Sequence, residues 1–223
     1  GGSGFYQTCT TLAKNGNGFA GWYISHAKLS SSDVFTTVDE FFNLCDAGSI
    51  KMEDPSKLVG NSSDVPEVGW GALRTGWNST DSVLGLISNN SALGHNHYDQ
   101  NSFLIGTNGM WIASDPGYST FVSQQQAKMQ FRNKVGHNTI LVDWEKNTTN
   151  GAQVFKGGGS LTANVLTPAF GYLTGSAAAS YGVNVLSQYD RHAIMVNHAG
   201  RPYYVLFDEL NSLNPHTYTW SLF

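Results

Sequence analysis

Apolar and polar residues alternate with a period of two along most of the chain after residue 68, and this pattern predicts β-strands. Turn-forming residues separate the alternating runs. The predicted strands are residues 69–76, 82–88, 101–107, 110–115, 138–143, 161–167, 184–197 and 202–210. The run at 123–132 departs from the pattern, and there we expect a short helix or an ordered loop. Together these strands and turns predict a mainly β protein built as an antiparallel β-sandwich.

Two hairpin turns join neighbouring predicted strands. Asn108 and Gly109 both tolerate the positive φ angles that a two-residue type I′ turn requires. Residues 197–200 end in Gly200, which gives a second turn the same conformational freedom. We therefore expect the strands on each side of these turns to pair antiparallel.

The N-terminal part of the chain has a different pattern. Apolar side chains recur at helical spacing in residues 30–46, after a start rich in serine and aspartate, and predict an amphipathic helix. Residues 21–29 are compatible with a second helix. Residues 51–68 contain two prolines and few apolar positions, which is typical of a linker. We therefore expect a helical segment over residues 1–50, a linker, and a β domain over residues 69–223.

The charge composition narrows the range of ligands. Charged residues make up 13% of the 223-residue chain, and the formal net charge is −4. This charged fraction is about half of the roughly 25% that is usual for soluble domains. No run of lysine or arginine is present to bind nucleic acid, whereas the plentiful Asn, Ser, Thr, Gly and aromatic residues suit a sugar ligand. We expect no nucleic-acid partner.

Membrane and export signals are absent from the sequence as it stands. No apolar stretch approaches the roughly 20 residues that span a bilayer, so we expect no membrane partner. The first residues lack the charged and apolar regions of a signal peptide, and an export signal would lie upstream. Cys9 and Cys45 permit at most one disulfide and form no metal motif; two buried thiols are an equal alternative.

Histidines and aspartates gather around the first hairpin. His95 and His97 are two residues apart, so in an extended segment both side chains lie on one face. The hairpin folds Asp115, at the end of the next strand, back toward them, and His137 begins another strand. Such ligands suit Zn²⁺ and are compatible with Mn²⁺, with one position left for water or substrate. The alternative is that these histidines are ordinary core or surface residues.

Asp99 is a further carboxylate in this region. It lies two positions after His97, so strand alternation places both side chains on one face, where Asp99 would hydrogen-bond a metal-binding imidazole. A simple turn residue explains it equally well. A pair of carboxylates for glycoside hydrolysis is also compatible with the sequence, because such pairs are defined by their separation in space.

These residues belong to a longer pattern. The sequence contains, in this order, GHNHYDQNSFLI, ASDPGY and FRNKVGHNTILVD. They resemble the pattern G-H-x-H-x-D-x-x-S-F, D-x-G and R-x-x-x-x-H-N-T of the heparinase II/III-like polysaccharide lyases, and the resemblance extends over about residues 65–223. It implies an N-terminal (α/α) toroid followed by antiparallel β-sheets. Residues 1–50 would then be the last helices of that toroid.

The resemblance also implies a role for each motif residue. His97, Asp115 and His137 would be the metal ligands, and the metal would be Zn²⁺, with Mn²⁺ or Ca²⁺ as alternatives. His95 would face the cleft as the catalytic residue. The spacing of the residues could not by itself separate the roles of His95 and His97.

Two further positions are candidates for substrate binding. Arg132 matches a family position near the substrate, although an ion pair with a carboxylate such as Asp143 explains it equally well. Tyr118 would contact a sugar, and a packed aromatic side chain is the alternative. The family takes a catalytic tyrosine from the toroid, most of which this sequence lacks, so the toroid of the same protein is an expected partner.

The implied reaction is β-elimination at a uronic acid residue of an anionic polysaccharide. The enzyme must stabilise charge on the uronate carboxylate and position a base and an acid. An imidazole with an ordinary pKa of about 6.5 suits this proton transfer, which fits His95. Family members act on alginate and on heparin-like glycosaminoglycans. Twelve basic residues are few for a sulfated polymer, so the sequence favours alginate.

Other functions stay open at this point. They are a heparin or heparan sulfate lyase, a uronate epimerase, a metal-dependent hydrolase, and a non-catalytic, metal-containing carbohydrate-binding β-sandwich. A binding module would have no use for His95 as a proton-transfer group beside the metal ligands. For a lyase of this kind we expect a secreted or periplasmic location.

Overall fold

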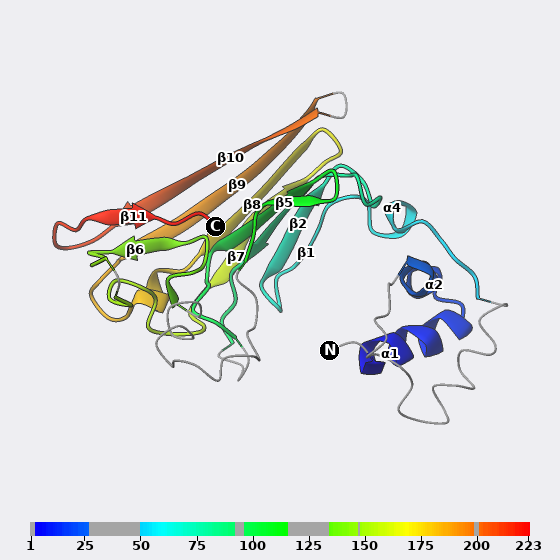
Figure 1. The fold of residues 1–223 in the computed structure, drawn as a ribbon, viewed down its shortest axis with the longest axis horizontal. Coiled ribbons are helices and arrows are strands. Elements are labelled where there is room, and N and C mark those ends of the chain that lie inside the picture. Colours follow the sequence, from blue (N-terminus) through cyan, green and yellow to red (C-terminus); the bar gives the residue numbers. More distant parts are fainter. Residues whose placement is uncertain (1–2, 27–49, 92–95, 116–133, 147, 199–200) are drawn as a thin grey trace. The chain divides into compact units, whose positions relative to one another are not determined.

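The computed structural model describes residues 3–26, 50–91, 96–115, 134–146, 148–198 and 201–223 (Figure 1). The chain divides into two compact units, Gly1–Gly60 and Asn61–Phe223. This boundary falls within the segment that the sequence predicts as a linker. None of the described helices is long and apolar enough to cross a membrane.

The first unit is helical. Its described helices are α1 (Ser3–Lys14), α2 (Gly18–His26) and α4 (Pro55–Leu58). α1 and α2 pack against each other through a small apolar core that includes Cys9, a buried free thiol. α2 confirms a helix near residues 21–29, but it begins three residues earlier. Cys45 and the helix predicted at residues 30–46 lie outside the described residues.

The second unit opens with a five-stranded antiparallel sheet, in which neighbours in sequence are neighbours in space. Its strands are β1 (Ser63–Val65), β2 (Trp70–Arg74), β3 (Val83–Ile87), β4 (Ser102–Thr107) and β5 (Met110–Ala113). Asn108 and Gly109 connect β4 to β5 with φ angles of 50° and 74°, as the hairpin prediction requires.

A four-stranded antiparallel sheet follows, with the order β10-β9-β8-β7 (Figure 1). Its strands are β7 (Ser160–Leu166), β8 (Phe170–Ser176), β9 (Gln188–His198) and β10 (Arg201–Asn211). A short 3₁₀ helix, η3 (Ala178–Tyr181), connects β8 to β9. β6 (Ile140–Val142) and β11 (Tyr218–Trp220) pair as a separate two-stranded sheet.

The core lies between the two larger sheets. Alternate residues of β2, β3 and β4 point inward and meet inward residues of β8 and β9. The fully buried members are Leu73, Leu84, Phe103, Leu173, Ala193 and Met195. A second cluster packs β6 against η3 and the start of β9, and it includes Tyr181 and Tyr189. The structure therefore confirms a mainly β protein built as an antiparallel sandwich.

Most predicted strands are present, although β9 begins at Gln188 and leaves out the first four residues of its predicted run. β8 was missed because its sequence, FGYLTGS, carries glycines where a β-branched residue would signal a strand. Both glycines are needed for close packing. A Cβ at Gly171 would lie 2.7 Å from the side chain of Leu73, and one at Gly175 would lie 2.3 Å from that of Asn101.

Candidate functional site

Four of the acidic and histidine residues meet at one end of the sandwich. His97 and Asp99 immediately precede β4, Asp115 follows β5, and His137 precedes β6. One ligand atom from each of His97, Asp99 and His137 lies within 4.8 Å of the other two. His137 Nδ1 donates a hydrogen bond to Asp115 Oδ2 at 2.7 Å. We call these four residues the His–Asp cluster.

His137 has the surroundings of a metal ligand. Its side chain is completely buried, and Nδ1 is held by Asp115. Nε2, on the other side of the ring, has no hydrogen-bond partner among the described residues. A buried polar atom left unpaired costs about 1–3 kcal/mol. A carboxylate on one ring nitrogen and a metal on the other is the common arrangement for metal-binding histidine, so these residues fit a divalent metal with nitrogen and oxygen ligands.

Burial also sets the protonation of the cluster. Desolvation lowers the pKa of His97, and the neighbouring His137 lowers it further. Desolvation raises the pKa of Asp99, while the two histidines act in the opposite direction. Both pKa shifts favour the neutral forms of these two side chains. A bound cation would oppose the rise in the pKa of Asp99 and reinforce the lowered pKa of His97, because it stabilises a carboxylate and a neutral imidazole lone pair.

The cluster can be compared with the expected site residues. The structure brings the three expected metal ligands, His97, Asp115 and His137, into one region and adds Asp99. The family resemblance implied Asp115 as a metal ligand, and the sequence left Asp99 equally as an imidazole partner or a turn residue. In the structure Asp99 joins the convergent set and Asp115 contacts His137. His95, Tyr118 and Arg132 lie outside the described residues, so their roles stay predictions.

A buried amide pair fixes the segment that carries His97 and Asp99. Gln153 Oε1 accepts from the backbone N–H of Gln100 at 2.9 Å, and Gln153 Nε2 donates to the carbonyl of Gln100 at 2.6 Å. The Gln100 side chain in turn accepts from the backbone N–H of Asn89 at 2.6 Å. Both glutamines are buried. This reciprocal pairing replaces strand hydrogen bonds where the chain turns toward β4.

Arg191 ties together the two segments that bear ligands. Its guanidinium is completely buried on β9 and forms a two-pronged ion pair with Asp208 of β10, with both N–O distances 2.7 Å. A third nitrogen donates to the backbone carbonyls of Asn101 and Asn138. Asn101 is two residues from Asp99, and Asn138 follows His137. Sequence reasoning missed this arginine, because a single basic residue in a strand carries no signal of where it points.

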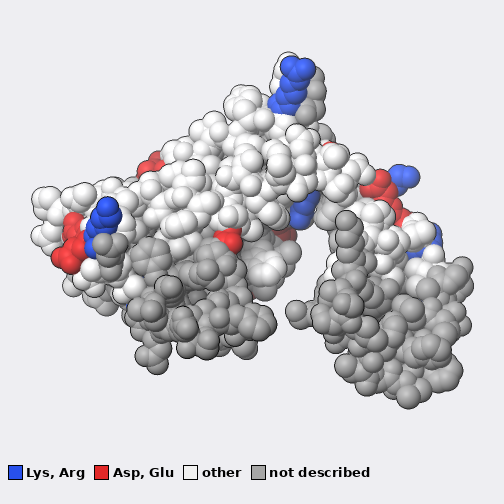
Figure 2. All heavy atoms as spheres, viewed as in Figure 1, with Lys and Arg blue, Asp and Glu red and all other residues white. Residues whose placement is uncertain are grey.

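Charged side chains are sparse on the surface. Figure 2 shows that lysine and arginine lie singly on the described part of the visible face, among mostly neutral side chains.

Comparison with known protein families identifies the fold. The family model described as "Heparinase II/III-like, C-terminal" matches residues 58–222. The chain belongs to the heparinase II/III-like family. The match confirms the resemblance seen in the sequence motifs, and the His–Asp cluster lies within it. No curated protein gives a significant match.

Several solved structures share the fold of this heparinase II/III-like chain. A heparinase III gene product has a TM-score of 0.61 at 14% identity, over 94% of this chain and 27% of that one. A heparan sulfate lyase, HepC from Pedobacter heparinus, has a TM-score of 0.57 at 16% identity, over 94% and 28%. Another heparinase III has 0.54 at 18%, over 74% and 24%. The chain thus spans 24–28% of the length of these proteins.

Proposed function

We propose that this chain is the C-terminal β-sandwich part of a polysaccharide lyase that cleaves a heparan sulfate-type glycosaminoglycan by β-elimination. The observation that carries the proposal is the convergence of His97, Asp99 and His137 inside a domain that matches the heparinase II/III-like family. The reaction removes the C5 proton of a uronic acid, breaks the C4–O bond, and leaves a C4=C5 double bond and a protonated leaving oxygen.

The choice of substrate differs from the expectation raised by composition. The scarcity of basic residues favoured alginate. The structural relatives reported above are named for heparinase and heparan sulfate lyase activity, which supports the heparin-type alternative. The chain spans about a quarter of the length of these relatives, so further basic residues that bind sulfate would lie in the rest of such a protein.

We propose that the His–Asp cluster holds a divalent metal, with Zn²⁺ as the metal that its donor set fits best. His97 and the free Nε2 of His137 are the nitrogen ligands, and one of the two carboxylates completes the set. When bound, the metal supplies a fixed positive charge and pins the segment before β4 to the segment before β6. It would stabilise the fold and organise the cleft, because binding energy at such a site is also folding energy.

We assign proton transfer to His95, two residues before His97 in the sequence. Its assignment rests on the sequence motif. The catalytic partner that the family resemblance implies, a tyrosine, would come from the toroid.

The lyase proposal is tested by ultraviolet absorbance of the new C4=C5 double bond. The protein is supplied with the toroid segment and given heparan sulfate, heparin, alginate or hyaluronan. We expect absorbance to rise with heparan sulfate, to be lost in His95→Ala, and to persist in His198→Ala, a control at an exposed histidine of β9. Binding without any rise in absorbance would refute the lyase and favour the carbohydrate-binding module.

The metal proposal has a readout that does not depend on activity. Elemental analysis and a titration with Zn²⁺ measure the metal content and affinity of His97→Ala, Asp99→Asn and Asp115→Asn. Loss of a direct ligand should abolish stoichiometric binding, whereas loss of the carboxylate that orients His137 should weaken it by about 10–100-fold. The two carboxylate variants therefore separate the two assignments. Wild-type affinity in all three variants would refute the site.

A further inference from the structure

The outer face of the five-stranded sheet carries a row of residues aligned across four strands. The strand registers place Arg74 opposite Val83, Val83 opposite Gly106, and Gly106 opposite Trp111. Residues directly opposite one another in a sheet project from the same face. With strands roughly 4.8 Å apart, the row from Arg74 to Trp111 measures about 14 Å, long enough for more than one sugar ring.

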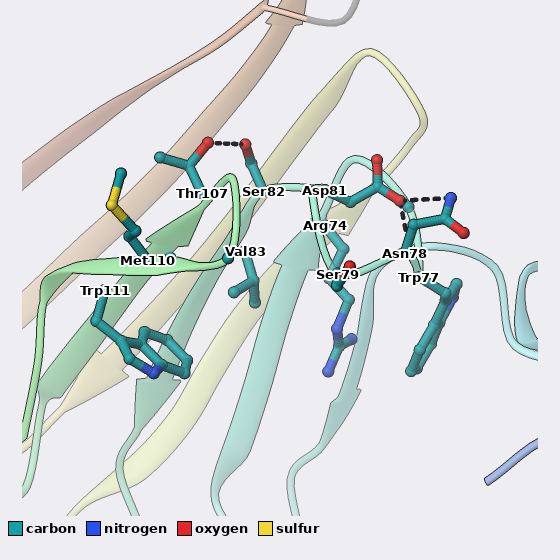
Figure 3. Close-up of a pocket in the computed structure, with 13 residues that line it drawn as sticks. Arg74, Trp77, Asn78, Ser79, Asp81, Ser82, Val83, Thr107, Met110 and Trp111 are labelled. Carbon is teal, nitrogen blue, oxygen red and sulfur yellow. Dashed lines mark hydrogen bonds between the residues drawn. The ribbon is translucent and has the colours of Figure 1, made fainter. Parts of the chain in front are cut away.

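This row and the loop beside it line an open pocket of about 390 Å³ (Figure 3). Figure 3 shows the side chains of Arg74, Trp77, Val83 and Trp111 pointing to the same side of the sheet. Trp111 is 60% exposed, and its indole lies against Gly106, where a Cβ would come within 3.1 Å of the ring. Glycine at this position therefore lets the indole lie close to the sheet as a flat apolar platform.

A second aromatic side chain is held beside the arginine. The Arg74 guanidinium carbon lies 4.4 Å from the centre of the Trp77 ring. The loop that carries Trp77 is fixed by Asp81, whose Oδ2 accepts from the backbone N–H of Asn78 at 2.7 Å and from its side-chain amide at 3.0 Å. The carboxylate of Asp81 is thus used within the loop.

Arg74 has no carboxylate partner among the described residues. Within the described residues its guanidinium donates two long hydrogen bonds, to the carbonyl of Asn61 and to Ser63 Oγ, both at 3.4 Å. Partial burial lowers the pKa of the Arg74 guanidinium, because desolvation disfavours its charge, so an anion beside it would be favoured. A half-buried cation with one indole ring against it, and a second indole at the other end of the row, suits an acidic sugar chain, which offers both negative groups and apolar ring faces.

The pocket is continuous with the His–Asp cluster along the sheet. Arg74 also lines a second hollow of about 490 Å³, and Asp99 and Asp115 of the cluster line the same hollow. Ser102 and Gly106 are four residues apart on β4, or roughly 13 Å. The face therefore leads from the cluster, past Arg74, to the two tryptophans.

We infer that Arg74, Trp77 and Trp111 form an extended binding subsite for the acidic polysaccharide, distant from the bond that is cleaved. The inference rests on the proposed function for its choice of ligand. Arg74 pairs with a carboxylate or sulfate group of a sugar, and the two indoles stack on apolar sugar faces. The subsite adds affinity for long chains and leaves a disaccharide at the His–Asp cluster unaffected.

The test is calorimetric titration of the full chain with heparan sulfate oligosaccharides of increasing length. We expect Arg74→Gln to lower the affinity for long oligosaccharides by about tenfold, as for loss of a charge-assisted hydrogen bond, and to leave disaccharide affinity unchanged. Arg74→Lys should keep part of the affinity. Trp111→Ala should show the same length dependence. Unsulfated heparosan oligosaccharides identify whether carboxylate alone suffices.

Matched controls remove one positive charge and one exposed aromatic side chain from the four-stranded sheet. Arg201→Gln deletes one positive charge at the start of β10, and Tyr203→Ala removes a side chain that is 55% exposed. Equal affinity in wild type and Arg74→Gln, a loss no larger than in Arg201→Gln, or a loss independent of oligosaccharide length would each overturn the subsite. Circular dichroism confirms that each variant is folded.

The subsite and the lyase can fail separately. Unsaturated product from the protein with its toroid, combined with unchanged binding by Arg74→Gln, would overturn the subsite and leave the lyase standing. Length-dependent binding that Arg74→Gln weakens, with no unsaturated product from any polymer, would support the subsite and refute the lyase.

Discussion

Removing Asp208 tests how the buried ion pair supports the fold. Arg191 is 0% exposed and Asp208 8% exposed, and two hydrogen bonds of 2.7 Å join them. Asp208→Ala leaves the guanidinium buried with no counter-charge, because its remaining hydrogen bonds are to neutral backbone carbonyls. Breaking a buried ion pair on one side costs about 3–5 kcal/mol of unfolding free energy.

Denaturant and thermal unfolding, followed by tryptophan fluorescence, measure this loss. For a domain of this size a loss of about 3–5 kcal/mol lowers Tm by roughly 6–20 °C. The control is Glu209→Ala, the next residue on β10, whose side chain is 55% exposed and should contribute no more than about 1 kcal/mol. A loss in Asp208→Ala no larger than in Glu209→Ala would refute the reasoning.

The same variant also reports on the candidate metal site. Arg191 holds the carbonyls of Asn101 and Asn138, which adjoin the two ligand-bearing segments. When Asp208 no longer orients Arg191, we expect Zn²⁺ affinity to fall at temperatures where the protein is still folded. Unchanged affinity would show that the ion pair stabilises the sandwich without positioning the ligands.

Two further predictions concern stability. Gly175→Ala would place a methyl group 2.3 Å from the buried side-chain oxygen of Asn101, and it should lower the free energy of unfolding, measured with denaturant, by about 1–3 kcal/mol. The control Gly85→Ala, whose Cβ would have its nearest neighbours at 4.0 Å, should leave the free energy of unfolding almost unchanged. Equal losses in the two variants would contradict the packing argument. A hydrogen bond from the backbone of Thr217, then one from His216, lowers the pKa of Asp143 below its ordinary 3.8. The ionised Asp143 therefore stabilises the fold above about pH 4, and this stabilisation is lost as pH falls through the lowered pKa. Asp143→Asn should make the free energy of unfolding depend less steeply on pH in this acid range. The same acid dependence in wild type and variant would show that Asp143 does not contribute to it.

The sequence predicted the architecture because its signal is local. In a strand, side chains alternate between two faces, so the pattern around Leu84 and Phe103 indicates which residues face a core before the core's other half is known. The Asn108–Gly109 turn is equally local. Strand β8 was not predicted because its glycines are required by close packing against Leu73 and Asn101. These residues are distant in sequence, so the local pattern does not indicate them.

The candidate site was predictable in part for the same reason. His97 and Asp99 are close in sequence, the predicted hairpin pointed to Asp115 and the following strand to His137, and the family resemblance then implied the role of each ligand. The sequence did not decide which carboxylate approaches which imidazole. That choice depends on how the ends of β4, β5 and β6 come together.

The sequence by itself determined the strand periodicity, the hairpin turn and the residue types able to bind a metal. Only the tertiary structure decided that Arg191, about 90 residues after Asn101, reaches its carbonyl, and that Arg74 and Trp111 lie in one row. The physical reason is that backbone alternation encodes the face on which a side chain lies, whereas its partners depend on strand order, register and sheet packing, which are properties of the whole chain.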